Sequence, residues 1–293
     1  MPRTLRPQVA VLTQAAPAGD DWLHEIKYDG YRTLCFFDGG EARLLTRNGY
    51  DWSDRYHAIG AILSKLRCAQ AIIDGEICVQ DETGLTSFAA LQDALATRAP
   101  ERLTYFAFDL LYLNGFDLTK TPLIERKREL KRLLKGVRDS VQYSDHIIGD
   151  GPAFFEHAEK LSLEGIVSKR LNAPYRPGKA RSWLKTKITK EENFVVVGYT
   201  ESAGGLSSLL LAERSSGSLQ YVGKVGTGLS LKEAALLLHA LRKISLKRPP
   251  KHLQPAGPVG RATWAAPKLT ARVRYNTRTA ANALRHPVFL GLV

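Results

Sequence analysis

The stretch Glu25-Ile26-Lys27-Tyr28-Asp29-Gly30-Tyr31-Arg32 decides how this chain is interpreted. The run 22–28 has the pattern of a strand that ends at the turn-forming pair Asp29-Gly30, so Lys27 is expected near a rigid strand end. A free lysine is protonated at neutral pH, with a pKa of about 10.4, and attacks phosphorus only where burial or cationic neighbours favour its neutral form. Taken alone, the stretch also fits a solvated lysine beside a turn, so the rest of the chain must decide.

Size and composition describe an ordinary globular chain. Its 293 residues suffice for one large domain or two smaller ones, and a hydrophobic content of 44% can fill a core. No apolar stretch approaches the roughly 20 residues of a membrane span, and the first residues lack the apolar segment of a secretory signal. Cys35, Cys68 and Cys78 lack metal-ligand spacing, and the first and last lie in apolar runs typical of buried, reduced thiols. We expect a soluble intracellular protein without a membrane partner.

Charge indicates a polyanionic partner. The formal net charge is +13 and the sequence pI is about 9.7. Residues 234–293 contain eleven Lys or Arg and no Asp or Glu, and residues 176–190 contain six basic residues and no acid. Such runs are often only solvated faces, but two basic zones around a candidate nucleotide site favour DNA or RNA, whose phosphates supply much of the binding affinity.

The patterns divide the chain in two near Lys190. Upstream, strand and helix patterns alternate. The strands predicted there are Trp22–Tyr28, the hairpin pair Arg32–Asp38 and Glu41–Thr46, Ala71–Val79, Leu103–Leu113, Gly165–Lys169 and a run at 182–187. The helices predicted there are Asp54–Leu66, Ser87–Ala96, Pro122–Leu134 and Pro152–Leu163.

The downstream part has short strands and one amphipathic helix. The predicted strands are Phe194–Tyr199, Leu206–Ala212, Leu219–Val225 and Arg272–Tyr275. The helix is predicted at 230–244 with Ser230 as its cap, and a proline-rich loop follows it. Few short strands with one helix in about a hundred residues fit a small β-barrel of the oligonucleotide-binding (OB) kind.

Further motifs place acids and bases on apolar strands. In Ile72-Ile73-Asp74-Gly75-Glu76-Ile77, both carboxylates point to one face because strands alternate with period two. Buried carboxylates need a metal, a ribose hydroxyl or an arginine nearby; the alternative is a turn with solvated acids. Glu164-Gly165-Ile166-Val167-Ser168-Lys169-Arg170 repeats the pattern, and Ser182-Trp183-Leu184-Lys185-Thr186-Lys187 places two lysines on one strand face, suited to phosphate oxygens. In 106–112, Phe106 and Tyr112 are predicted core, and Phe108 is the candidate stacking ring.

Taken in order, these elements resemble the covalent nucleotidyltransferase superfamily of DNA ligases, RNA ligases and mRNA capping enzymes. The resemblance covers nearly the whole chain and rests on six ordered segments: Lys27–Arg32, Arg47-Asn48-Gly49, Asp74-Gly75-Glu76, Phe108-Asp109-Leu110, Glu164–Lys169 and Trp183–Lys187. Within the superfamily, Ala173-Pro174-Tyr175-Arg176-Pro177-Gly178 and residues 284–292 look most like the ATP-dependent DNA ligase module of bacterial non-homologous end joining.

The resemblance implies an α+β fold in two domains. Residues 1–190 would form an ATP-grasp-like nucleotidyltransferase (adenylation) domain of antiparallel sheets and helices, and residues 191–293 an all-β OB-fold DNA-binding domain. The implied enzyme is an ATP-dependent DNA ligase, which joins a 3′-hydroxyl to a 5′-phosphate through a lysyl-AMP intermediate in double-strand-break repair. In this family an arginine–x–aspartate–lysine element follows the Gly-Leu ending, whereas this sequence stops at Val293. Either the sequence is truncated or the natural protein lacks the element. If the natural protein lacks it, we expect impaired self-adenylation, with sealing by already adenylated protein preserved.

The resemblance also implies residue roles, with Lys27 as the nucleophile. ATP would be bound by Glu25, Ile26, Arg32, Arg47, Glu76, Phe108, Val167, Lys185 and Lys187. Among these, Lys185 and Lys187 would hold the α-phosphate, Glu76 the ribose, and Arg32 and Arg47 the ribose and DNA phosphates. Mg²⁺ or Mn²⁺ would be bound by Asp29, Glu76 and Glu164. DNA would be contacted by Arg176, Lys179, Arg181, Lys224, Arg272, Arg274 and Arg285.

The partners implied are double-stranded DNA with nicks or ends, a Ku-like end-binding protein and a repair polymerase. The protein is expected to be a monomer in the bacterial cytoplasm, associated with the nucleoid. Two alternatives stay open at this point. One is an RNA ligase or a GTP-using capping enzyme. The other is a non-catalytic DNA-end-binding protein whose nucleotide site has decayed.

Overall fold

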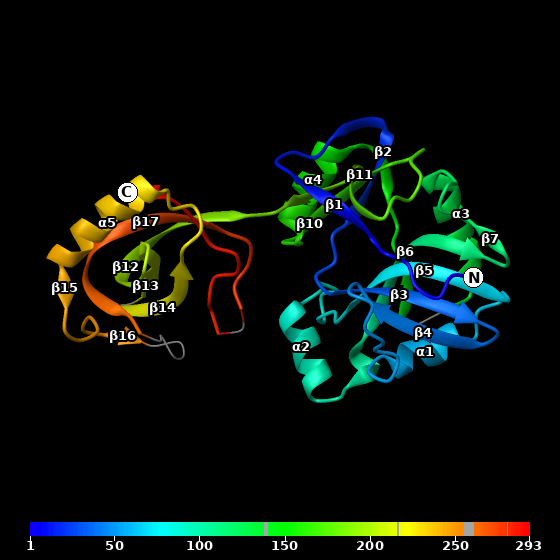
Figure 1. Cartoon of the computed structure of the whole chain (residues 1–293), viewed down its shortest axis with the longest axis horizontal. Helices are drawn as coiled ribbons and strands as arrows, with labels where there is room; N and C mark the ends of the chain where they lie inside the picture. The colour runs from blue at the N-terminus through cyan, green and yellow to red at the C-terminus, as the bar shows by residue number, and fades with distance from the viewer. Residues whose placement is uncertain (138–139, 216, 255–260, 280) are drawn as a thin grey trace. The chain divides into compact units, whose positions relative to one another are not determined.

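The computed structural model describes residues 1–137, 140–215, 217–254, 261–279 and 281–293. It folds into two compact units, Met1–Ile188 and Thr189–Val293. Figure 1 shows the elements of each unit, which are described separately below. No helix in the described ranges is long and apolar enough to cross a membrane.

The first unit contains two sheets. One has the strand order β1 (Gln8–Thr13), β11 (Gly178–Lys187), β10 (Gly165–Arg170), β2 (Ala18–Ile26) and β9 (Ile147–Asp150). The other has the order β4 (Glu41–Thr46), β3 (Tyr31–Asp38), β5 (Gln70–Cys78), β6 (Thr104–Leu113) and β7 (Phe116–Asp117), with β8 (Val141–Tyr143) beside β6. Pairing is antiparallel except for β1 with β11 and β8 with β6, which run parallel.

The described residues of this unit also form four α-helices and a short 3₁₀ helix. They are α1 (His57–Leu63), α2 (Phe88–Ala96), η1 (Pro100–Arg102), α3 (Leu123–Leu133) and α4 (Gly151–Lys160). The main core joins β3, β5 and β6 to α1, α2 and α3 through fully buried side chains such as Ile73, Tyr105 and Leu130. Gly75 lets β5 and β6 approach closely, because a Cβ there would collide with the Tyr105 ring.

Most of the predicted elements of this unit are confirmed; the differences include the end of β2 and the strands β1, β7, β8 and β9, which were not predicted. The predicted strand 22–28 ends at Ile26, so Lys27 and Tyr28 follow the strand instead of lying within it. Strand β1 was not predicted, because an edge strand with intermediate burial leaves only a weak alternation in the sequence. The predicted hairpin forms as expected, with both glycines of Gly39-Gly40 at positive φ (56° and 95°).

In the described part of the second unit, the chain forms one seven-stranded sheet and one α-helix. The strand order is β15 (Ser245–Leu246), β17 (Thr263–Tyr275), β12 (Lys190–Ser202), β13 (Gly205–Ser215), β14 (Ser218–Val225) and β16 (Leu253–Gln254), with β18 (Val288–Leu292) paired to β17. The curved sheet and its helix, α5 (Leu231–Lys243), enclose a core that includes Phe194, Leu209 and Leu241 (Figure 1).

In this unit the predicted cap of α5 and the predicted strand Arg272–Tyr275 can be compared with the observed elements. Ser230 caps α5 as predicted, and Glu233 closes a reciprocal capping box. The last predicted strand begins nine residues earlier, at Thr263 instead of Arg272. Within the proline-rich loop predicted after α5, residues 255–260 lie outside the described residues.

Candidate active site

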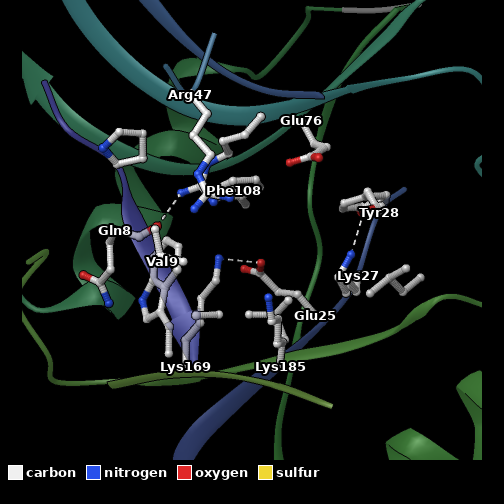
Figure 2. A pocket seen from close by; sticks show the side chains of 16 residues that line it. Gln8, Val9, Glu25, Lys27, Tyr28, Arg47, Glu76, Phe108, Lys169 and Lys185 are labelled. Atoms are coloured by element: carbon white, nitrogen blue, oxygen red, sulfur yellow. Dashed lines mark hydrogen bonds and ion pairs between the residues drawn. The ribbon is translucent and has the colours of Figure 1, made fainter. Parts of the chain in front are cut away.

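A pocket in the first unit gathers nine of the ten residues predicted for Lys27 and the nucleotide. Figure 2 shows their side chains around a common space. The predicted residues that line it are Glu25, Ile26, Lys27, Arg32, Arg47, Glu76, Phe108, Val167 and Lys185. Lys187 is not part of the lining but lies one alternation beyond Lys185 on β11, beside Glu164. Segments far apart in sequence therefore supply one site.

Lys27 is held where the end of β2 meets the start of β10. Its backbone N–H donates to the Gly165 carbonyl at 3.0 Å, and its Nζ forms an ion pair with Glu164. The other oxygen of Glu164 lies 3.2 Å from Lys187 Nζ. Gly165, at φ 146°, permits the close approach of β10 to β11, because a Cβ at this position would collide with the Thr186 carbonyl. The Glu164 carboxylate thus bridges the candidate nucleophile and a candidate phosphate ligand.

Arg32 and Asp74 form a buried bidentate ion pair beside the pocket. The guanidinium donates to the two Asp74 oxygens at 2.5 and 2.6 Å, and Tyr175 Oη donates to the same carboxylate at 2.7 Å. Burial disfavours the charge of Arg32, but Asp74 outweighs it and raises the arginine pKa. Of the partners that the sequence left open for Asp74, the structure selects arginine. Arg32 lines the pocket with its guanidinium already engaged, its centre 4.5 Å from the Phe108 ring.

Two other lining residues, Glu76 and Lys185, have shifted pKa values. Burial raises the pKa of Glu76 to about 7, against the opposing charges of Arg32 and Lys27. Burial lowers the pKa of Lys185, and the cations Lys27, Lys187 and Arg47 lower it further. A concentration of cations of this kind suits an anionic phosphate chain.

A second buried network stands behind the pocket. Both oxygens of Glu25 accept from ammonium groups, one from Lys127 and the other from Lys169 at 2.6 Å. Burial would raise the pKa of Glu25, but the two lysines outweigh it and hold that pKa below its ordinary value. Burial lowers the pKa of Lys169 to about 8. Its ammonium lies 4.4 Å from the Phe108 ring centre and 4.2 Å from that of Trp183.

Several of these residues were not predicted as site residues from the sequence. Lys169, Trp183 and Tyr28 line the pocket although only their motifs had been noted. Lys127 occupies the buried face of α3, which also includes Leu123, Arg126 and Leu130. Charged residues at the spacing of the apolar stripe of a helix indicate buried charges, and buried charges predict partners of opposite charge nearby. The predicted core residues Phe106 and Tyr112 are buried, and Phe108 is buried but reaches the pocket.

The unpredicted strand β1 forms another wall. Pro7, Gln8, Val9 and Ala10 line the pocket. The Gln8 side chain ties β1 both to the segment before β11 and to β11 itself: its Oε1 accepts from the Arg176 backbone N–H at 2.6 Å, and its Nε2 donates to Ser182 Oγ at 3.0 Å. These bonds fix the parallel β1–β11 pair at the edge of the sheet.

The three predicted metal ligands do not form a ready-made cage. Within the described ranges, no group of three His, Cys, Asp or Glu side chains is placed to hold a metal ion. Glu164 is engaged with two lysines, and the Asp29 backbone N–H donates to Thr86 Oγ1 at 3.1 Å. Mg²⁺ commonly uses only one or two carboxylates together with substrate phosphates, so Glu76 and Glu164 still fit such a site.

The predicted DNA contacts fall into two groups. Arg176, Lys179 and Arg181 are exposed on or just before β11 in the first unit. In the second unit Lys224 is exposed on β14, and Arg285 is half-buried. Arg272 and Arg274 lie on one face of β17, where both pair with Glu191 at 2.6 and 2.7 Å but stay 59% and 47% exposed. These positions are surface-accessible cations, and a DNA contact at each stays a prediction.

Fold and site together define a class. A lysine at a pocket lined by aromatic and basic side chains, in a nucleotidyltransferase domain followed by an OB-type domain, is the arrangement of the covalent nucleotidyltransferases. The chain belongs to the ATP-dependent DNA ligase family: the ATP dependent DNA ligase domain matches residues 8–187, and the ATP dependent DNA ligase C terminal region matches residues 202–292.

Individual relatives agree with this membership. The chain is 35% identical over its whole length to the multifunctional non-homologous end joining protein LigD of Pseudomonas aeruginosa, of which it spans 36%. The crystal structure of the ligase domain from M. tuberculosis LigD has a TM-score of 0.59 and 32% identity, covering 99% of this chain and 95% of that one. The structure of a mycobacterial DNA ligase D complexed with ATP and MES has a TM-score of 0.60 and 33% sequence identity, and it also covers 99% of this chain and 95% of that one.

Proposed function

We propose that this chain is an ATP-dependent DNA-sealing enzyme that carries AMP on Lys27. The single observation behind this proposal is the placement of Lys27 at a pocket that also contains Phe108, Val167 and Lys185, in a chain of the ATP-dependent DNA ligase family. A purely DNA-binding relative would have no chemical need for this set of buried acids and lysines. In this proposal residues 1–190 carry out adenylation and residues 191–293 bind DNA.

The reaction consists of three nucleotidyl transfers. The neutral Lys27 amine attacks the α-phosphorus of ATP, the bond to the β-phosphate oxygen breaks, and pyrophosphate leaves. The AMP then passes from Lys27 to the 5′-phosphate at a nick. The 3′-hydroxyl attacks that phosphate, a phosphodiester forms, and AMP departs. Each step is a displacement at phosphorus that depends mainly on positioning and charge neutralisation.

The residues around Lys27 have complementary roles in this scheme. Glu164, already paired with the Lys27 ammonium, is placed to accept its proton. Lys185 and Lys187 hold phosphate oxygens, and the Phe108 ring stacks on the base. Glu76 and Glu164 would hold Mg²⁺, which would neutralise phosphate charge. The predicted contribution of Asp29 to the metal site stays a proposal.

Substrate and partners follow from the relatives and from charge. Since the relatives are named for non-homologous end joining, we propose nicked or broken duplex DNA as the substrate, and a Ku-like protein and a repair polymerase as partners. The second unit has fifteen Lys and Arg against five Glu, a net charge of +10, which would attract DNA phosphates. A monomer located at the nucleoid completes the proposal.

The test is a matrix of substrates with one variant as control. The protein would be incubated with α-labelled ATP or GTP and Mg²⁺, and then offered nicked DNA or nicked RNA. We expect acid-stable label from ATP and joining of nicked DNA, with neither in Lys27→Ala. Joining of RNA alone, label from GTP alone, or DNA binding without label would contradict the proposal.

A further inference from the structure

One carboxylate serves two buried lysines behind the pocket. Glu25 is 2% exposed, and its partners Lys127 and Lys169 are 0% and 2% exposed. They come from three different elements: Glu25 from β2, Lys127 from α3 and Lys169 from β10. Glu25 and Lys169 line the pocket, whereas Lys127 does not. Lys127 bonds to Glu25, and Glu25 bonds to Lys169; Figure 2 shows the Lys169 side chain directed toward Glu25.

The second lysine is costly for stability alone. A single ammonium would neutralise Glu25, so Lys127 and Lys169 together leave a positive charge in a buried place, where charge is expensive. The nearby Asp109 also attracts the Lys169 charge, but its two oxygens accept from Arg126 at 2.8 Å each, so its negative charge is already balanced by that guanidinium. The excess charge reaches the pocket through Lys169, whose ammonium lies 4.4 Å from the centre of the Phe108 ring and 4.2 Å from that of the Trp183 ring.

Lys127 is the anchored end of this chain of contacts. Besides Glu25, its ammonium donates to the Ser144 carbonyl at 2.9 Å and lies 4.6 Å from the centre of the Tyr143 ring. Without Lys127, Glu25 would keep only its bond to Lys169, and both side chains in the pocket wall would gain freedom to move.

We propose that Lys127 is a positioning residue for nucleotide binding: it fixes Glu25, and through Glu25 the ammonium of Lys169, in the wall of the pocket. The inference rests on the proposed function. It adds a residue from α3 that does not line the pocket, and it assigns that residue to ATP affinity and not to the transfer of AMP at Lys27, which is held separately by Glu164.

The experiment compares Lys127→Met with Lys131→Met in the full chain. Lys131 lies one turn further along α3, is exposed and pairs with Asp145. Its ammonium shares the Tyr143 ring with Lys127, at 5.2 Å from the ring centre, but pairs with Asp145 instead of Glu25, so it receives the same chemical change away from the Glu25 carboxylate. For Lys127→Met we expect the ATP dissociation constant, measured without divalent cations, and the KM for lysyl-AMP formation to rise about 10- to 100-fold. The maximal rate of adenylation should stay within about 3-fold, and Lys127→Arg should recover most of the affinity.

Two further measurements separate positioning from a general structural role. Thermal unfolding checks the fold of each variant; if Lys127→Met does not fold, Lys127→Gln, which keeps a donor for the Ser144 carbonyl, carries the same expectation. In a double-mutant cycle, Glu25→Gln and Lys127→Met should be strongly non-additive in ATP affinity.

The outcomes are distinguishable from those of the proposed function. Wild-type protein that binds ATP but never becomes labelled overturns the ligase proposal. Folded Lys127→Met that binds ATP like wild type, or that loses maximal rate with an unchanged KM, overturns the positioning role.

Discussion

The two units of this molecule carry charge in different ways. The first unit has a net charge of only +3 but encloses ion pairs in its interior, such as Arg126 with Asp109, both fully buried. The second unit has a net charge of +10, and its ion pairs lie at the surface, as Arg272 and Arg274 do beside Glu191. Charge is thus paired and fixed in one unit, and exposed and in excess in the other.

This difference indicates that the first unit contains the reactive site, whereas the second unit attracts the polyanionic DNA. Burying a charge costs free energy, and buried charged groups of this kind are concentrated at functional sites. Exposed charge costs little and acts at long range on a polyanion. Substitutions in the first unit should therefore abolish a reaction or destabilise the fold, whereas those in the second should shift DNA affinity in a salt-dependent manner.

The largest expected effect belongs to Lys27. Lys27→Ala should abolish AMP transfer to the protein, because it removes the amine that forms the bond to the α-phosphorus. The measurement is acid-stable label after incubation with α-labelled ATP and Mg²⁺, with a melting curve to show that the variant is folded. A stable adduct on this variant would refute the assignment.

The next largest effect is expected at the buried ion pair between Arg126 of α3 and Asp109 of β6. Arg126→Leu leaves Asp109 charged and unpaired in the interior, and should lower the free energy of unfolding by about 3–5 kcal/mol. Arg128→Leu, two residues along the same helix and exposed, should change it by about 0.5 kcal/mol or less. Urea denaturation of both variants gives the comparison, and equal effects would show that burial does not separate the two positions.

Lys187 tests the phosphate end of the site. Lys187→Ala should slow adenylation about 100-fold through lost charge on the phosphates, with unfolding unchanged. Its control is Lys160→Ala, an exposed lysine at the end of α4. Single-turnover labelling measures the rate, and a rate equal to that of the control would remove Lys187 from the site.

Glu76 predicts a pH dependence of stability. Its pKa is raised to about 7 from an ordinary value of 4.5, so between these values the folded state holds a proton that the unfolded state has released. The free energy of unfolding should therefore fall as pH rises through this window. Glu76→Gln should lack this fall and be more stable than wild type at pH 8 by about 1–3 kcal/mol without nucleotide. Parallel pH profiles for both proteins would disprove the shift.

The smallest effect is expected in the second unit. The double variant Arg272→Gln with Arg274→Gln should weaken binding of nicked DNA by about 3- to 10-fold at moderate salt and reduce the salt slope by about 1–2. Adenylation without DNA should be unchanged, which serves as the internal control. Loss of labelling in this variant would contradict the assignment of adenylation to the first unit and DNA attraction to the second.

The sequence predicted those parts of the fold that have local signals. The hairpin about Gly39-Gly40 and the capped helix α5 were read correctly because turn residues and caps act over a few positions. Strand β1 escaped because its pairing partner, β11, lies about 170 residues away and the two run parallel. The start of β17 was placed nine residues late, since its first half lacks a clear alternation.

The site divides along the same line. Motif residues such as Lys27, Glu76 and Phe108 were predicted and line one pocket. The partners of these residues were not, because Tyr175 beside Asp74 and Lys127 beside Glu25 meet only through tertiary contacts across about a hundred residues. Spacing identifies which residues carry charge; burial and pairing decide which of those charges are fixed.

The central claim is that Lys27 becomes covalently adenylated. Peptide mass spectrometry of the purified protein, after incubation with ATP and Mg²⁺, tests it most directly. The account predicts one adenylyl group on Lys27, which disappears when nicked DNA is added and sealed. An unmodified Lys27, or an adduct on Lys169 or Lys185 instead, would contradict it.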